Sequence, residues 1–274
     1  MTPSRTLDPV TRVAALLLVV IVGYALLGPL VAPVDADTID WDALEAAPDG
    51  KHWFGTDLAG RDLFARAADG ARVSLAVALV ATGVSVLIGL PWGALAGYAG
   101  GRTDQLLMRV VDVLYGLPFI LIVIVLVVVF GRSPVLLYVG LGAVFWLDLA
   151  RIVRGQTLRL RHEAFVMAAQ ALGAPAWLII ARHILPNVAG PAIAWITLTL
   201  PGVILAESFV SFLGLGIQEP DTSWGVLIAD GTQSLESAPW TLLIPAALLG
   251  ATVWSVSMLG DYLRDRLDPH QRGP

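Results

Sequence analysis

Six long stretches of the sequence contain no charged residue. They cover residues 13–34, 73–101, 113–131, 133–147, 184–206 and 237–260. A helix needs about 20 apolar residues to cross the hydrocarbon layer of a membrane, which is roughly 30 Å thick. Five of the stretches reach or approach this length. The remaining one, residues 133–147, is shorter unless Asp148 lies at its edge. Because backbone amides in lipid must be satisfied within their own segment, the sequence predicts an all-α polytopic protein with about six transmembrane helices.

The composition supports a membrane protein and excludes several other classes. Hydrophobic residues make up 57% of the 274 residues and charged residues only 14%, whereas soluble proteins carry about 25% charge. The absence of cysteine excludes disulfides, Cys-ligated zinc and thiolate catalysis. The four histidines lie far apart with no metal-ligand spacing, so we expect no metal site. We expect a lipid membrane around the chain, no nucleic-acid partner, and a first span that is retained rather than cleaved as a signal peptide.

The basic residues predict the orientation. With the N-terminus inside, twelve of the 17 Lys and Arg residues fall on inner segments, and the outer loop 212–240 has none. The positive-inside rule therefore places both termini in the cytoplasm. The predicted order is a cytoplasmic N-terminus (1–12), a first transmembrane helix (13–34), an extracytoplasmic loop (35–72), a core of five transmembrane helices (73–260) with a cytoplasmic loop (151–187), and a cytoplasmic tail (261–274). Four outer tryptophans fit interface anchoring, namely Trp41, Trp53, Trp224 and Trp240.

The second span carries glycines at intervals of four residues, at Gly89, Gly93 and Gly97. Small residues on one face let helix backbones approach closely in lipid, so these positions predict a helix-packing face, with a moving seam as the alternative. Pro91 suggests a kink in the same span.

The inner loop 151–187 is long and partly apolar, and it predicts two short helices. The first, 162–172, has one apolar side made of Phe165, Val166, Ala169 and Leu172. Gly173 suits the position just past its end. Pro175 suits the first turn of the second helix, which continues to Leu185 and is limited by Pro186. Two hypotheses follow: a docking site for a cytosolic partner, or an amphipathic pair lying on the membrane surface.

This loop resembles the signature loop of permease subunits in ABC-type importers. The family pattern is Glu-Ala-Ala, three residues, Gly, nine residues, Ile, one residue, Leu-Pro. The corresponding positions here are Met167-Ala168-Ala169, Gly173, His183 and Leu185-Pro186. Met167 and His183 depart from the pattern, and Glu163 lies one helical turn before Met167. Residues 182–187 look like the version found in the peptide and nickel branch of the family.

The resemblance extends along nearly the whole chain. Five further pieces, 52–57, 60–62, 71–75, 211–216 with 224–225, and 260–265 with 267–269, look like C-type subunits of dipeptide and oligopeptide importers. It implies a MetI-like type I permease fold in the plasma (inner) membrane of a prokaryote. It also implies a heterodimer with a second homologous permease, two cytosolic ATP-binding subunits and an extracytoplasmic solute-binding protein. Dipeptides or oligopeptides are the implied cargo, with nickel or another small solute as the alternative.

The resemblance implies that the inner loop couples the pore to the ATPases. The implied coupling residues are Glu163, Met167, Ala168, Ala169, Gly173, Ala174, Pro175, Trp177, His183, Leu185 and Pro186. The sequence has no Gly-rich phosphate loop with Lys-Ser/Thr, so we expect no cofactor and no catalysis in this chain, with ATP and Mg bound by partner subunits. Gly173→Pro or Ala169→Arg is expected to uncouple ATP hydrolysis from uptake without preventing membrane insertion.

Charged residues near or within the spans need an explanation, because each costs roughly 2.5–3.5 kcal/mol at the bilayer centre. Glu207 has apolar sequence on both sides, and with Ser208 and Ser211 it is a candidate for the pathway or outer gate, or for a hydrogen bond to the partner subunit. Asp112 follows Arg109 by three residues and Asp148 precedes Arg151 by three. This spacing predicts an ion pair within each helix or a role at the inner gate.

Two other function classes are known for helical bundles in membranes. A self-sufficient proton-coupled secondary transporter would use Glu207, Asp112 and Asp148 as a relay. An intramembrane enzyme needs a paired nucleophile and base or a metal site, and the sequence offers neither.

The first outer loop contains a cluster of four charged residues, Asp57, Arg61, Asp62 and Arg66. The cluster suggests either a solvated loop with its own ion pairs or a contact with another subunit.

Overall fold

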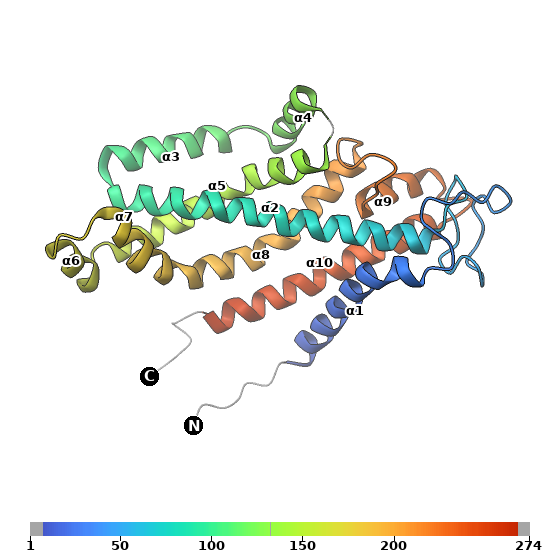
Figure 1. Cartoon of the computed structure of the whole chain (residues 1–274), viewed down its shortest axis with the longest axis horizontal. Helices are drawn as coiled ribbons and strands as arrows, with labels where there is room; N and C mark the ends of the chain where they lie inside the picture. Colours follow the sequence, from blue (N-terminus) through green and yellow to red (C-terminus); the bar gives the residue numbers. More distant parts are fainter. Residues whose placement is uncertain (1–7, 132, 268–274) are drawn as a thin grey trace.

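The computed structural model describes residues 8–131 and 133–267. Within these ranges the chain is helical, and the only β pairing is two isolated bridges, Ile39 with Arg61 and Thr56 with Asp62. The helices, shown in Figure 1, are α1 (Pro9–Val31), α2 (Leu63–Ala99), α3 (Gly101–Tyr115), α4 (Phe119–Phe130), α5 (Pro134–Leu160), α6 (Ala164–Ala171), α7 (Ala176–Ile179), a π-helical turn (Ile180–Ile184), α8 (Leu185–Phe212), α9 (Trp224–Gln233) and α10 (Trp240–Leu267).

The number of membrane spans agrees with the sequence prediction. Five helical segments are long and apolar enough to cross a bilayer, and α3 with α4 makes a sixth if that bent pair counts as one span. The prediction of a regular third helix over 113–131 is wrong, because α3 and α4 meet at an angle of 85°. Pro118 lies at this break; proline has no N–H to donate, and it disfavours helical conformation in the residue before it.

Two predicted boundaries also differ. Helix α2 begins at Leu63 rather than at 73, because the Asp62 carboxylate caps it by accepting from the Ala65 amide at 2.8 Å. The second helix of the inner loop does not end at Pro186. Residues from Ala176 to Phe212 form one continuous helical segment. Pro186 directly follows the π-helical turn Ile180–Ile184, where the regular α-helical hydrogen-bond pattern is already interrupted, so its missing donor does not end the helix.

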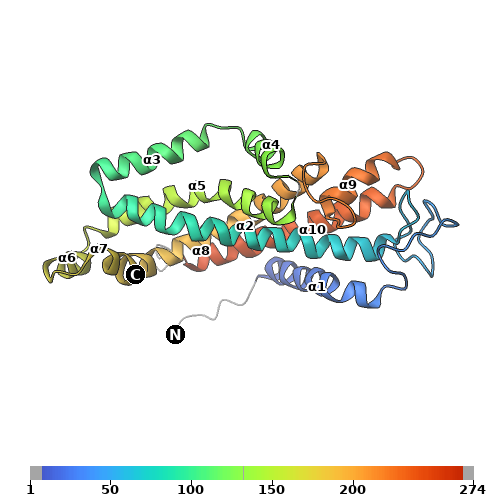
Figure 2. The same ribbon diagram turned by 45° about the horizontal axis from the view of Figure 1, so that its top comes forward.

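Helices α2, α5, α8 and α10 run side by side along the long axis of the bundle (Figure 1). Helices α3 and α4 lie on one side and α1 on the other, as the turned view in Figure 2 also shows. The short helices α6 and α7 lie at one end, and the loop between α1 and α2 lies at the other. Helix α1 begins, and α10 ends, on the side toward α6 and α7.

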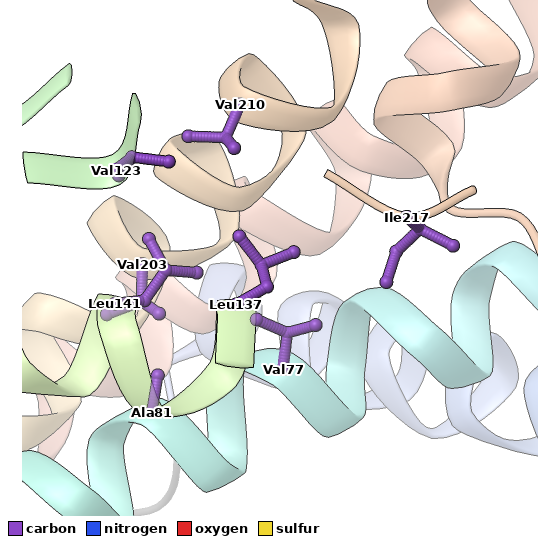
Figure 3. Packing of buried hydrophobic residues seen from close by; sticks show 8 residues of the cluster. All are labelled: Val77, Ala81, Val123, Leu137, Leu141, Val203, Val210 and Ile217. Carbon is purple, nitrogen blue, oxygen red and sulfur yellow. The ribbon is translucent and has the colours of Figure 1, made fainter. Parts of the chain in front are cut away.

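An apolar cluster joins four of these helices in the half of the bundle near α9. Figure 3 shows side chains from α2, α4, α5 and α8 meeting there, together with Ile217 from the following loop. The members are Val77, Ala81, Val123, Leu137, Leu141, Val203, Val210 and Ile217. This packing fixes α4 to the bundle, although α4 makes a sharp angle with α3.

The glycine stripe of α2 faces α5. A Cβ atom at Gly89 would lie 2.9 Å from the Trp146 carbonyl, one at Gly93 would lie 2.8 Å from Val153 Cβ, and one at Gly97 would lie 2.7 Å from Thr157 Cβ. The two helix backbones are therefore in direct contact over two turns, which only residues without a side chain permit. Helix α2 runs without interruption through Pro91.

Candidate functional site

The two short helices α6 and α7 and the connection between them, residues 164–179, form what we call the elbow. Gly173 directly follows the C-cap of α6 and has a φ of 80°, a left-handed conformation that glycine adopts without strain. A Cβ atom at Gly173 would meet no other atom within 4 Å. The glycine is therefore required by the backbone turn and not by crowding around it.

One side of the elbow packs into the bundle. Val166 and Ile179 are fully buried, and they join a cluster with Ala94 of α2 and with Leu149 and Val153 of α5. Ala169, Ala174 and Leu185 pack against the same cluster. The Gln170 amide donates to the Tyr98 hydroxyl at 3.2 Å, which adds a polar link to α2. A displacement of the elbow must therefore move α2 and α5 as well, because close-packed interiors transmit strain.

The other side of the elbow is apolar and exposed. Leu172 is 88% exposed, Trp177 68% and Met167 51%, and Ala168 and Pro175 are exposed beside them. The predicted common side of Phe165, Val166, Ala169 and Leu172 is wrong, since Val166 and Ala169 face inward while Phe165 and Leu172 face outward. Leu172 points away because α6 ends at Ala171 and the backbone turns at Leu172.

The remaining residues of the family pattern lie around the elbow. His183 is half-buried in the π-helical turn, 6.2 Å from the Phe165 ring between centroids. Its carbonyl accepts from the Asn187 side chain at 2.6 Å. Glu163 and Pro186 are exposed, and Glu163 stands at the N-cap of α6.

Glu207 is fully buried near the C-terminal end of α8. Its carboxylate accepts hydrogen bonds from the hydroxyls of Ser211 at 2.8 Å, Ser74 at 3.1 Å and Ser208 at 3.3 Å. The Trp224 amide in turn donates to Ser74 Oγ at 3.3 Å. Glu207 thus links α8, α2 and the start of α9, and in this conformation its carboxylate does not line an open space.

Two members of this network were not predicted from the sequence. Ser74 is separated from Glu207 by 133 residues, so no local spacing reveals it. Trp224 is fully buried and donates its indole N–H to the Ala67 carbonyl at 3.1 Å. Its prediction as a membrane-interface anchor is therefore wrong; the tertiary fold places α9 over α2.

The two predicted intrahelical ion pairs are wrong as well. Asp112 of α3 pairs with Arg151 of α5, with 2.9 Å between Oδ1 and Nη2. Arg154 binds the Asp104 carboxylate with both Nε and Nη2, at 2.5 and 2.6 Å. The carboxylates and guanidinium groups reach across from α3 to α5, so the spacing of three residues within one helix does not decide the partner. No ion pair of Asp148 is found among the described residues.

The charged cluster in the loop between α1 and α2 and at the start of α2 is held by its own ion pairs and is largely buried. Arg61 binds Asp57 at 2.8 Å and Glu219 of the loop before α9 at 2.7 Å, and Asp57, Asp62 and Arg66 are buried. The hydrogen bond from Arg61 lowers the pKa of the Glu219 carboxyl. Within the described residues, no group of three or more His, Asp or Glu side chains is placed to hold a metal ion.

Comparison with known proteins identifies the family. Residues 89–273 match the family described as the binding-protein-dependent transport system inner membrane component. The chain belongs to this family. It is 46% identical over 259 residues to the oligopeptide transport system permease protein OppC of Haemophilus influenzae, covering 94% of this chain and 83% of the relative. It is 44% identical over 249 residues to the dipeptide transport system permease protein DppC of Bacillus subtilis, covering 90% of this chain and 78% of the relative.

The fold also matches solved structures of this type. An inward-facing structure of the MetNI methionine ABC transporter aligns with a TM-score of 0.58 at 20% identity, covering 74% of this chain and 96% of that chain. A second inward-facing structure of the same transporter aligns with a TM-score of 0.57 at 19% identity, covering 73% of this chain and 94% of that chain. The MetI-like permease fold implied by the sequence is confirmed.

Proposed function

We propose that this chain is the transmembrane permease subunit of an ATP-binding-cassette importer and forms half of a pathway for dipeptides or oligopeptides. It pairs with a second homologous permease, works with two cytosolic ATP-binding subunits and receives cargo from an extracytoplasmic solute-binding protein. The membrane is the inner membrane of a prokaryote. Both termini lie in the cytoplasm, on the same side as the elbow.

The assignment to peptides is supported by the relatives. The OppC and DppC proteins are described as permeases for oligopeptides and dipeptides, and each match covers at least 90% of this chain. Nickel or another small solute is the alternative cargo.

The elbow is the single observation that carries the coupling role. Its outer side offers exposed apolar residues, with Leu172 at 88% and Trp177 at 68% exposure, and apolar groups at the centre of a protein interface supply most of its binding energy. Its inner side is fixed to α2 and α5 through Val166 and Ile179. A partner bound to the outer side can therefore move the spans directly.

The chain is proposed to be a non-catalytic subunit. Its sequence has no Gly-rich loop ending in Lys-Ser/Thr, which ATP-binding subunits of this kind use to hold phosphates. ATP and Mg are expected to bind only in the partner chains.

The proton-coupled alternative has less support from the geometry. A relay needs its carboxylates in a connected series. Glu207 is enclosed by three serine hydroxyls between α2 and α8, whereas Asp112 is paired with Arg151 on the α3 side of the bundle.

The test replaces the exposed elbow residues in the complete transporter. Leu172→Ser with Trp177→Ser removes apolar surface without disturbing the buried side, so the expected result is normal membrane insertion, loss of copurifying ATP-binding subunit and loss of ATP-driven peptide uptake. Trp41→Ser is the matched control, because Trp41 is 74% exposed and belongs to the loop between α1 and α2, which lies at the opposite end of the bundle. It should leave the copurification unchanged. Normal copurification and uptake in the elbow double variant would refute the docking role.

A further inference from the structure

A polar cavity of about 480 Å³ lies between α3 and α5. Its lining residues are Gln105, Met108, Arg109, Asp112, Arg151 and Arg154. Neither the family pattern nor the coupling role uses this cavity, and its three arginines are unusual on helices that cross a membrane.

The arginines outnumber the carboxylates around the cavity. Arg151 pairs with Asp112, and its guanidinium also lies 4.2 Å from the centroid of the Tyr115 ring. Arg154 pairs with Asp104. Arg109 is exposed, and among the described residues no carboxylate lies within ion-pair distance of it. Arg109 is therefore the one arginine of the cavity lining without a carboxylate partner among the described residues.

The cavity lies well inside the ends of its helices. Arg109 stands eight residues after the first residue of α3, and Arg151 nine residues before the last residue of α5. At a rise of about 1.5 Å per residue, Arg109 lies about 12 Å from the start of α3 and Arg151 about 14 Å from the end of α5. Ionisable side chains on candidate membrane-spanning helices face protein or a water-filled space, because exposure to hydrocarbon is unfavourable.

The other side of the bundle has the opposite character. A groove of about 470 Å³ between α1, α2, α8 and α10 is lined almost wholly by aliphatic side chains, among them Val22, Leu79, Leu200 and Leu259. Figures 1 and 2 place α1 and α3 on opposite sides of α2. The groove suits contact with lipid tails, whereas the α3–α5 side suits contact with water.

We propose that the α3–α5 cavity is a water-filled part of the translocation pathway, and that Arg109 makes it an attractive site for the carboxylate end of the solute. This inference rests on the proposed function, since a peptide carries a terminal carboxylate. It assigns the inner part of the pathway wall to α3 and α5 and gives Arg109 a role in receiving an anionic group.

The absence of cysteine from the chain allows a direct test by thiol labelling. Single variants Gln105→Cys and Met108→Cys in the complete transporter are treated, in inside-out vesicles, with membrane-impermeant methanethiosulfonates that carry either a sulfonate or a trimethylammonium group. Leu79→Cys, in the apolar groove and 68% exposed, is the matched control. The cavity cysteines should react with both reagents, and the control cysteine should stay unlabelled.

The charge preference tests the role of Arg109. Residues 105 and 109 are neighbours on one helix face, about 6 Å apart. The positive charge of residue 109 attracts the sulfonate reagent and repels the trimethylammonium reagent. By Coulomb's law in bulk water at that distance, removing this charge changes the ratio of sulfonate to trimethylammonium labelling about tenfold. Arg109→Gln in the Gln105→Cys background should therefore lower the ratio about tenfold, Arg109→Lys should preserve it, and Asp112→Asn should raise it.

Two results would overturn the inference. Cavity cysteines as unreactive as Leu79→Cys would mean that lipid or protein covers this side. Labelling with a ratio that none of the charge variants alters would mean that Arg109 does not set the potential of the cavity. Peptide uptake by the same vesicles before labelling is measured separately, so a failure of the proposed function is distinguished from a failure of this assignment.

Discussion

The direct backbone contact between α2 and α5 gives a quantitative prediction for Gly93→Ala. The added methyl would lie 2.8 Å from Val153 Cβ and 3.0 Å from the Arg154 amide nitrogen, whereas ordinary contacts begin at 3.4 Å. The closest obstacle is the backbone carbonyl oxygen of Ala150, so α5 as a whole has to move outward. Overpacking of this kind lowers the free energy of unfolding by about 1–3 kcal/mol.

Gly83→Ala is the matched control for Gly93→Ala. Gly83 lies on the same helix, is exposed, and has no atom within 4 Å of an added Cβ. Helix propensity alone predicts that Gly83→Ala leaves stability unchanged or raises it by up to about 1 kcal/mol.

The assay is unfolding of the purified permease in mixed micelles by increasing SDS, followed by tryptophan fluorescence. Trp92 and Trp146 report on this contact because their ring centroids are 5.1 Å apart beside it. A Gly93→Ala variant as stable as the wild type, or a Gly83→Ala variant equally destabilised, would show that backbone contact is not what the stripe provides.

Three further predictions concern other polar contacts. Arg72 donates to the Ala25 carbonyl at 2.5 Å, which has no helical donor because residue 29 is a proline. Arg72→Ala should therefore lower the free energy of unfolding in SDS by about 1.5–3 kcal/mol, and by less in a Pro29→Ala background, where the backbone donor is restored. An equal loss in both backgrounds would contradict this role. Glu207→Ala should leave Ser74 and Ser211 without their acceptor and speed hydrogen exchange at the Trp224 amide, whereas Glu207→Gln keeps an acceptor oxygen and should change it little; unchanged exchange in both would separate Glu207 from α9. The Arg61 hydrogen bond lowers the pKa of Glu219, so its stabilisation is complete above the unfolded pKa of about 4.3 and is lost as the pH falls through the lower folded value. Glu219→Gln should flatten this part of the pH–stability curve by less than about 1 kcal/mol, since the carboxylate is exposed, and an identical curve would refute the pair.

The sequence predicted the parts of the fold that depend on local physics. Charge-free stretches located the spans because lipid excludes unpaired charges and unsatisfied amides alike. Gly173 ended α6 as predicted, since its left-handed conformation is a local requirement. Pro186 was misjudged because the π-helical turn before it, through which the helix continues past the proline, has no recognisable signal in the sequence.

The parts that could not be predicted depend on contacts between distant segments. Asp112 forms its ion pair with Arg151, 39 residues away, and not with Arg109. This pairing follows only from the placement of α3 against α5. The enclosure of Glu207 likewise depends on Ser74, which α2 supplies. The division of the elbow into a buried and an exposed side needed the position of α2 and α5, since α6 alone has apolar residues on both sides.

The central claim is that this bundle moves solute only when a separate ATPase acts on it through the elbow. The most direct measurement is peptide accumulation in proteoliposomes that contain either this chain alone with an imposed proton gradient, or the complete transporter with ATP. The predicted result is accumulation against a gradient in the complete transporter and none with the chain alone. Uphill accumulation by the chain alone would contradict the account.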